Sequence, residues 1–221
     1  MTDLSTPILY SFRRCPYAMR ARMGIWASGM QVELREVALR NKPDEMIAIS
    51  PKATVPVLCK SRDFILEESL DVMKWALSEN DPMGWRRGAD SAKIDGLIAQ
   101  CDGPFKHHLD RYKYAVRYVD VDAEEFSMMH RARACEILAN WNEILSAHPF
   151  LLGDKESMAD IAIFPFVRQF AHADKVWFDA QPWPALQKWL AQYLDGDLFA
   201  AIMTKYTPWK MGDAPIYFGQ F

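Results

Sequence analysis

Long apolar runs, blocks of like charge and paired cysteines are all missing from this chain of 221 residues. No stretch approaches the ~20 consecutive apolar residues of a membrane-spanning helix. The net charge of −3 is spread without a basic run, which argues against nucleic acid as the main partner. There is also no internal repeat and no low-complexity tract. These absences leave a compact protein of one or two domains, without a membrane segment.

Cysteine is scarce, and the four that are present form no disulfide or metal-ligand pattern. Such usage fits a reducing compartment. The first seven residues contain neither the basic segment nor the apolar core of an export signal, so we expect a cytoplasmic protein. Cys59, Cys101 and Cys135 lie in apolar or helical patterns, where a free cysteine is usually a small buried hydrophobe.

Cys15 has a different setting from the other three. It precedes Pro16 at the junction of a strand-like run and an expected helix, and proline is favoured in the first helical turn. Unpaired amides at a helix N-terminus carry partial positive charge. Four arginines add nearby cations: Arg13, Arg14, Arg20 and Arg22. Both effects favour the thiolate and predict a pKa below the usual ~8.5, in the range of about 3.5–7.5. Cys15 is therefore the candidate nucleophile.

A second cysteine of a CxxC redox motif would stand at the position of Ala18. The motif therefore lacks a resolving thiol, and any disulfide chemistry at Cys15 needs an external thiol to complete the cycle.

Two kinds of hydrophobic pattern divide the chain into two parts. Strand-like runs at 8–12, 32–39, 55–58 and 64–66 alternate with helical patterns at 17–28 and 69–78, which predicts an α/β domain over residues 1–80. The stretch 80–88 concentrates proline, glycine and asparagine, and residues 81–89 are predicted to be a linker. Amphipathic helices are then expected at about 91–118, 123–147, 158–173 and 184–194. Residues 90–221 are therefore predicted to form an all-helical domain.

Two short segments of the α/β half are candidate binding elements. Pro56 opens a strand-like run, and a cis bond before it would turn the N–H and C=O groups of Val55 toward a peptide-like ligand. Glu68 and Ser69 stand at a strand-to-helix junction. They are either helix-capping residues or a binding site for an α-amino acid group, in which the Glu68 carboxylate pairs with the ammonium of the ligand.

In the helical half, Ser157 and Asp160 have the spacing of a capping box. We interpret Asp160 as a folding determinant, and its loss alone would cost about 0.5–2 kcal/mol.

His107 and His108 are adjacent, so they point to different helix faces and form a poor metal pair; we expect no metal. Aromatic residues beside a histidine can instead line a cleft for an apolar acceptor. His108, Tyr112 and Phe166 are the candidates for that role.

Taken in order, these motifs resemble the cytosolic glutathione transferases, and within them the omega-like, cysteine-type classes. The motifs are Cys15-Pro16-Tyr17-Ala18, Asn41-Lys42-Pro43, Val55-Pro56-Val57, Glu68-Ser69 and the Ser157-to-Asp160 box, and they span nearly the whole chain. The resemblance implies a glutathione transferase fold, in which a thioredoxin-like N-terminal domain precedes an all-α C-terminal domain. It also implies a homodimer, with glutathione as co-substrate.

By the same resemblance, Cys15 meets the glutathione sulfur and Lys42 assists the glycine carboxylate. Val55, before a cis-Pro56, pairs with the cysteinyl backbone, while Glu68 and Ser69 hold the γ-glutamyl end. Tyr17 joins these glutathione-binding residues. The segment Lys52-Ala53-Thr54 departs from the Phe-Gly or similar pair often found before this Val-Pro.

The expected activity is glutathione-dependent thiol transfer or reduction through a mixed disulfide at Cys15, including deglutathionylation of small adducts and reduction of dehydroascorbate. The partner is a small apolar or glutathionylated acceptor. Two alternatives stay open. Tyr10, Ser11 and Tyr17 could support conjugation of glutathione to electrophiles. The fold also serves as a non-catalytic binding module in some relatives, among them a bacterial regulator that binds RNA polymerase.

Overall fold

The computed structural model describes residues 6–86 and 90–219 and divides the chain into two compact units. The first comprises Met1–Gly84 together with Asp195–Phe221, and the second is Trp85–Leu194. The expected boundaries differ at one point, since the helical domain was predicted to continue to residue 221. The final segment instead returns to the first unit, where it adds a strand to the sheet. Part of the expected linker 81–89, residues 87–89, lies outside the described residues.

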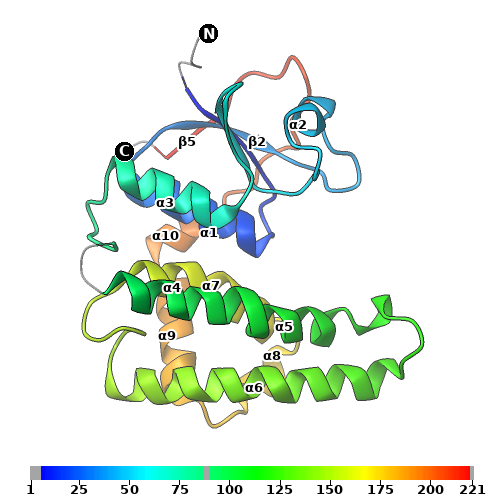
Figure 1. Ribbon diagram of the computed structural model, residues 1–221, viewed down its shortest axis with the longest axis vertical. Helices are drawn as coiled ribbons and strands as arrows, with labels where there is room; N and C mark the ends of the chain where they lie inside the picture. The colour runs from blue at the N-terminus through cyan, green and yellow to red at the C-terminus, as the bar shows by residue number, and fades with distance from the viewer. Residues whose placement is uncertain (1–5, 87–89, 220–221) are drawn as a thin grey trace. The chain divides into compact units, whose positions relative to one another are not determined.

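The first unit is built on a five-stranded sheet of order β4-β3-β1-β2-β5 (Figure 1). The strands are β1 (Ile8–Ser11), β2 (Val32–Glu36), β3 (Val57–Ser61), β4 (Phe64–Leu66) and β5 (Tyr217–Phe218). β1 and β2 are parallel, whereas β3, β4 and β5 each run antiparallel to their neighbours. The four N-terminal strands were predicted, but β5 was not.

Helices cover both faces of this sheet. They are α1 (Pro16–Ser28), α2 (Asp44–Ile49), α3 (Ser69–Glu79) and α10 (Asp197–Ile202). Side chains alternate along a strand. Tyr10 therefore shares a face with Met46 of α2 in one apolar cluster, while Ser11 faces the other way and accepts a hydrogen bond from Arg22 of α1. Figure 1 shows α1 and α3 side by side along the sheet.

Gly24 allows α1 and α3 to approach closely. A Cβ atom at this position would lie 2.9 Å from both the Cα and the Cγ atoms of Met73. Gly24→Ala should therefore destabilise the protein by about 1–3 kcal/mol, although alanine is the better helix former by about 1 kcal/mol. Denaturant unfolding measures this change. The matched control is Gly96→Ala, because a Cβ at Gly96 meets nothing within 4 Å, and equal stability of the two variants would refute the packing argument.

The described residues of the second unit form helices joined by loops, with an isolated β-bridge between Phe150 and Gly153. The unit contains α4 (Ser91–Gln100), a π-helical turn (Cys101–Phe105), α5 (Lys106–Lys113), a 3₁₀ turn (Ala115–Arg117), α6 (Ala123–Ala147), α7 (Met158–Ala171), α8 (Lys175–Asp179) and α9 (Pro184–Leu194). The single helix expected over 91–118 is helical from Ser91 to Lys113, but it passes through a π-helical turn that contains Pro104, which cannot donate a backbone hydrogen bond. The α-helical conformation ends at Tyr114, before the 3₁₀ turn.

The predicted capping box at Ser157 and Asp160 is present at the start of α7. The rings of Trp141 and Phe105 pack together in the core of this unit, with centroids 5.1 Å apart and planes inclined at 60°. Among the described residues, no helix is both long and apolar enough to cross a membrane.

Candidate functional site

Cys15 is the N-cap residue of α1, as the sequence pattern predicted. Its backbone is extended (φ −74°, ψ 124°), and Pro16 begins the helix. The Cys15 N–H donates to the carbonyl of Phe12 (3.1 Å), and the Cys15 carbonyl accepts from the N–H of Met19 (2.8 Å). The Cys15 side chain is partly exposed and makes no capping bond to the helix. The thiol therefore stands at the positive end of the helix dipole without being used to cap it.

Two predicted site residues, 40 positions apart, meet at this thiol. The Sγ atom of Cys15 lies 3.7 Å from the carbonyl oxygen of Val55. The peptide bond between Val55 and Pro56 is cis, which confirms that prediction. The Cys15 thiol therefore lies next to the Val55 backbone in the first unit. This backbone is the segment that we expect to pair with a peptide-like ligand.

Arg22 supplies a buried positive charge behind the turn that carries Cys15. The residue is only 1% exposed. Its guanidinium donates to the carbonyls of Arg13 (2.6 Å), Phe12 (3.3 Å) and Ile202 (3.1 Å), and to the hydroxyl of Ser11. Burial lowers the pKa of Arg22 to about 10, opposed by the negative charges of Glu36 and Cys15. Arg22 therefore remains a cation at neutral pH, and its charge favours the Cys15 thiolate.

The four arginines near Cys15 differ in their burial and in the groups that they contact. Arg20 is also buried, and its Nη1 lies 3.4 Å from the hydroxyl of Ser69. The backbone N–H of Arg13 donates to the Glu36 carboxylate (2.8 Å). Arg14 is exposed, with its guanidinium 5.6 Å from the Phe12 ring centroid. The sequence pattern treated all four as nearby cations, whereas burial distinguishes Arg20 and Arg22 from the others.

Glu68 and Ser69 begin α3. Glu68 is the N-cap residue by backbone position, but its side chain does not cap the helix. Its carboxylate instead accepts from the ammonium of Lys52 (2.9 Å) on the surface. Ser69 is the first helical residue and is 3% exposed. The sequence analysis did not predict the ion pair between Lys52 and Glu68. The only signal for it in the sequence was a pair of opposite charges 16 positions apart.

Ala53, next to Lys52, has a positive φ of 52°. Glycine adopts this left-handed backbone more readily than alanine. Ala53 therefore holds a backbone conformation that costs alanine more than it would cost glycine.

Lys42 and Tyr17 are both partly exposed. Lys42 lies in the loop before α2, and it forms no hydrogen bond or ion pair within residues 6–86 and 90–219. Tyr17 lies in the first turn of α1, with the Arg20 guanidinium 5.9 Å from its ring centroid. A cationic side chain without an internal partner is available to a ligand carboxylate.

The alternative hydroxyl groups for a conjugating site are mostly engaged. Tyr10 is 2% exposed, and its hydroxyl accepts from Arg35 (2.7 Å). Burial raises the pKa of Tyr10. Ser11 is fully buried against Arg22. Of the three candidates, Tyr17 alone retains an exposed surface.

Of the other three cysteines, Cys59 and Cys101 are buried as expected, whereas Cys135 is only partly buried. All four cysteines are free. Burial raises the pKa of Cys59, and it raises the pKa of Cys135 to about 11. Cys101 is fully buried. Because the thiolate is the reactive form, Cys59 and Cys135 are poor nucleophiles at neutral pH.

The candidate acceptor residues divide into two groups. His108 and Tyr112 lie four residues apart on α5, both partly exposed. The Tyr112 ring packs against the Phe170 ring, with centroids 5.2 Å apart and planes inclined at 46°. Phe166 is fully buried in α7 and belongs to the core. Phe166 therefore offers no exposed surface to an acceptor in this structure, and the acceptor role of all three residues stays a prediction.

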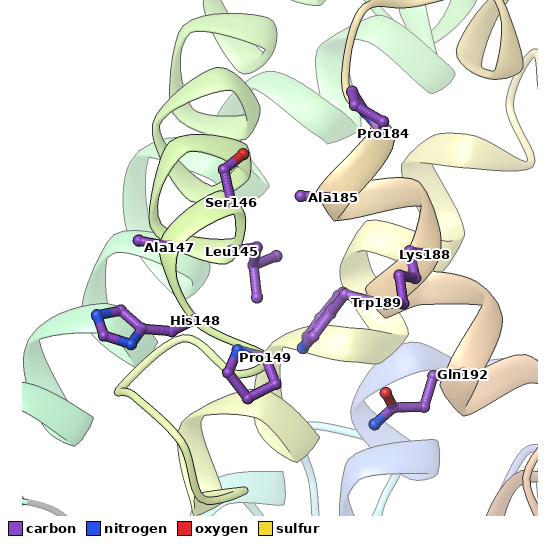
Figure 2. Close-up of a pocket in the computed structure, with 10 residues that line it drawn as sticks. All are labelled: Leu145, Ser146, Ala147, His148, Pro149, Pro184, Ala185, Lys188, Trp189 and Gln192. Carbon is purple, nitrogen blue, oxygen red and sulfur yellow. The ribbon is translucent and has the colours of Figure 1, made fainter.

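A separate pocket of about 580 Å³ lies within the second unit, between the C-terminal end of α6 and α9 (Figure 2). It is lined by Leu145, Ser146, Ala147, His148, Pro149, Pro184, Ala185, Lys188, Trp189 and Gln192. None of the predicted acceptor residues lines it, so this pocket is distinct from the predicted acceptor site.

Two family models match the chain in order. The model for the N-terminal domain of glutathione S-transferase matches residues 9–84, and that for the C-terminal domain matches residues 106–192. Glutathione S-transferase omega-1 of Mus musculus is 37% identical over 62 residues, 28% of this chain and 26% of that protein. A probable glutathione transferase of Aplysia californica is 40% identical over 55 residues, 25% of this chain and 60% of that protein. Each match therefore spans less than two thirds of the relative.

Solved structures share the fold over nearly the whole chain. A glutathione transferase family member from Pseudomonas fluorescens has a TM-score of 0.76 at 14% identity, covering 90% of this chain and 92% of that one. A glutathione S-transferase from Rhodospirillum rubrum has a TM-score of 0.73 at 19% identity, covering 96% of each chain. These likenesses confirm the thioredoxin-like domain followed by a helical domain. With both domain models matched in order, the chain belongs to the glutathione S-transferase superfamily.

Proposed function

We propose that this chain is an omega-like, cysteine-type glutathione transferase that performs thiol transfer and glutathione-dependent reduction. The observation that carries the proposal is the position of Cys15. Its thiol stands at the N-terminus of α1, near the buried charge of Arg22 and 3.7 Å from the Val55 carbonyl. A helix N-terminus and a nearby cation both favour a thiolate.

The surroundings of Cys15 fit glutathione as the co-substrate. Val55 offers backbone groups beside the thiol, and Lys42 is a free cation within the described residues. Glu68 with Ser69 would receive the γ-glutamyl end, which requires the Glu68 carboxylate to exchange Lys52 for the ligand's ammonium. The similar Pseudomonas fluorescens protein was solved with two glutathione molecules bound.

The reaction proceeds through two thiol–disulfide exchanges. The Cys15 thiolate attacks the glutathionyl sulfur of a mixed disulfide, forming a Cys15–glutathione disulfide and releasing the acceptor as a thiolate that takes a proton from water. The thiolate of a second glutathione then attacks the glutathionyl sulfur on Cys15. Oxidised glutathione leaves, and the Cys15 thiolate is regenerated. Because position 18 is alanine, the second thiol must come from solution.

Small molecules that carry a glutathionyl disulfide are the acceptors that these two exchanges suit. Dehydroascorbate would react by another route, in which the Cys15 thiolate adds to a carbonyl carbon and a glutathione thiolate then attacks the Cys15 sulfur, releasing ascorbate and leaving a Cys15–glutathione disulfide for the second glutathione to reduce. The four free cysteines fit a reducing, cytoplasmic compartment. A homodimer remains part of the proposal.

Incubation with oxidised glutathione near neutral pH tests the proposal. We expect intact mass spectrometry to show one added glutathionyl group, and peptide mapping to place it on Cys15. Cys59 and Cys135 should remain unmodified because burial raises both pKa values. Label on another cysteine would contradict the mechanism. Retention of the protein on immobilised glutathione without any label would favour conjugation, and absence of retention would favour a binding module.

A further inference from the structure

Three histidines of the second unit come together where α5 packs against α6. His107 and His108 belong to α5, and His130 belongs to α6. The two helices lie side by side (Figure 1). One ring nitrogen from each histidine lies within 4.8 Å of the other two. The sequence suggested a poor metal pair because it considered adjacent residues of one helix, whereas the third imidazole comes from 22 positions farther along.

Hydrogen bonding already holds two of the rings together. The Nδ1 atoms of His108 and His130 are 2.7 Å apart. One Nδ1 must therefore donate a proton and the other must accept it. His130 is 7% exposed and rests on the ring of Phe126, with centroids 4.5 Å apart. The inner part of the cluster is thus fixed by packing.

We infer that His107, His108 and His130 form a binding site for a divalent transition metal ion of the Zn²⁺ type. Neutral imidazole is a ligand for zinc, copper and nickel, while magnesium and calcium prefer oxygen. Tetrahedral zinc, with Zn–N bonds of about 2.0–2.1 Å, places ligand nitrogens roughly 3.3–3.4 Å apart. The observed separations of 2.7 Å and at most 4.8 Å bracket that spacing. Three protein ligands leave a further coordination position for water.

A metal at this site would replace the hydrogen bond between the Nδ1 atoms of His108 and His130. If it bound both Nδ1 atoms, the remaining proton of each neutral ring would lie on Nε2.

Arg111 competes with a metal at the outer histidine. Its Nη1 lies 2.9 Å from the Nδ1 of His107 and 3.2 Å from the His107 carbonyl oxygen. When it donates to Nδ1, the guanidinium occupies one of the two ring nitrogens of His107 that can bind a metal, and it places a positive charge beside the site. Arg111→Gln should therefore strengthen zinc binding, an effect that a purely structural histidine cluster would not produce.

Zinc titration of the untagged, EDTA-stripped protein against a chromophoric chelator tests the inference. We expect one Zn²⁺ to bind and Mg²⁺ not to compete. His107→Ala should weaken binding about tenfold or more, since even outer-shell changes typically cost about 10–100-fold. His107 is exposed, so this variant should fold, which circular dichroism can verify. His148→Ala is the matched control because His148 is an exposed histidine beside Asp154, outside the cluster.

Cobalt provides an independent readout of the ligands. Co²⁺ should give the visible bands of a tetrahedral nitrogen site without a sulfur-to-metal charge-transfer band. Zinc affinity that is unchanged in His107→Ala, or that is lost in Cys15→Ser, would overturn the inference, as would the absence of zinc binding to the wild-type protein. None of these outcomes alters the glutathionylation test of Cys15.

Discussion

Cys15→Ser should lose thiol transfer by about a thousandfold or more, because removal of a covalent nucleophile leaves only binding and orientation. The variant should remain folded, since serine is a favoured N-cap residue and position 15 is the N-cap of α1. Measurement of glutathione-dependent reduction of a small mixed disulfide checks the loss, with thermal unfolding as the test of folding.

The same variant separates the two enzymatic mechanisms. A serine hydroxyl can donate a hydrogen bond to a bound glutathione thiolate but cannot form a mixed disulfide. Weak conjugation of glutathione to an electrophile should therefore persist or increase in Cys15→Ser. Cys135→Ser is the matched control, because burial raises the pKa of Cys135 to about 11 and its loss should leave thiol transfer unchanged. Thiol transfer that survives in Cys15→Ser would exclude Cys15 as the nucleophile.

Asp160→Ala should destabilise the protein by about 3–4 kcal/mol, more than the loss of an ordinary helix cap. Asp160 is fully buried. Its carboxylate accepts from the N–H of Leu151 (2.9 Å), both the N–H (3.0 Å) and hydroxyl (2.8 Å) of Ser157, and the indole of Trp189 (3.1 Å). Each donor left unsatisfied in the interior costs about 1–3 kcal/mol, although such costs do not add fully.

Asp122→Ala is the control for this comparison. Asp122 caps α6 in an exposed position, where its carboxylate accepts from the N–H of Glu125 (2.8 Å). Its loss should cost about 0.5–2 kcal/mol. Denaturant unfolding of both variants measures the difference, and glutathione affinity per folded molecule should stay the same. Equal losses in the two variants would mean that Asp160 acts only as a cap, as the sequence alone suggested.

Local sequence patterns were sufficient to predict the elements whose structure depends on residues close together in the chain. The strand at 64–66 and the helices at 123–147 and 184–194 begin and end where their periodicity predicted. The helix start at Cys15-Pro16 and the box at Ser157 were also visible, because capping depends on residues within one turn. The order of the motifs then pointed to the family whose domain models match the chain.

Tertiary packing decided how distant segments combine. The residues after Leu194 were predicted to remain helical, yet β5 pairs with β2 because backbone groups at the sheet edge need partners. Burial distinguished Arg20 and Arg22 from the other two arginines, and Lys52 paired with Glu68 from the far side of strands β3 and β4 in the chain. The metal-site candidate arose in the same way, since helix packing brought His130 to two histidines of another helix. The periodicity of a sequence predicts which face of its own helix or strand a side chain occupies. Which residue that side chain meets on another element depends on how the two elements pack.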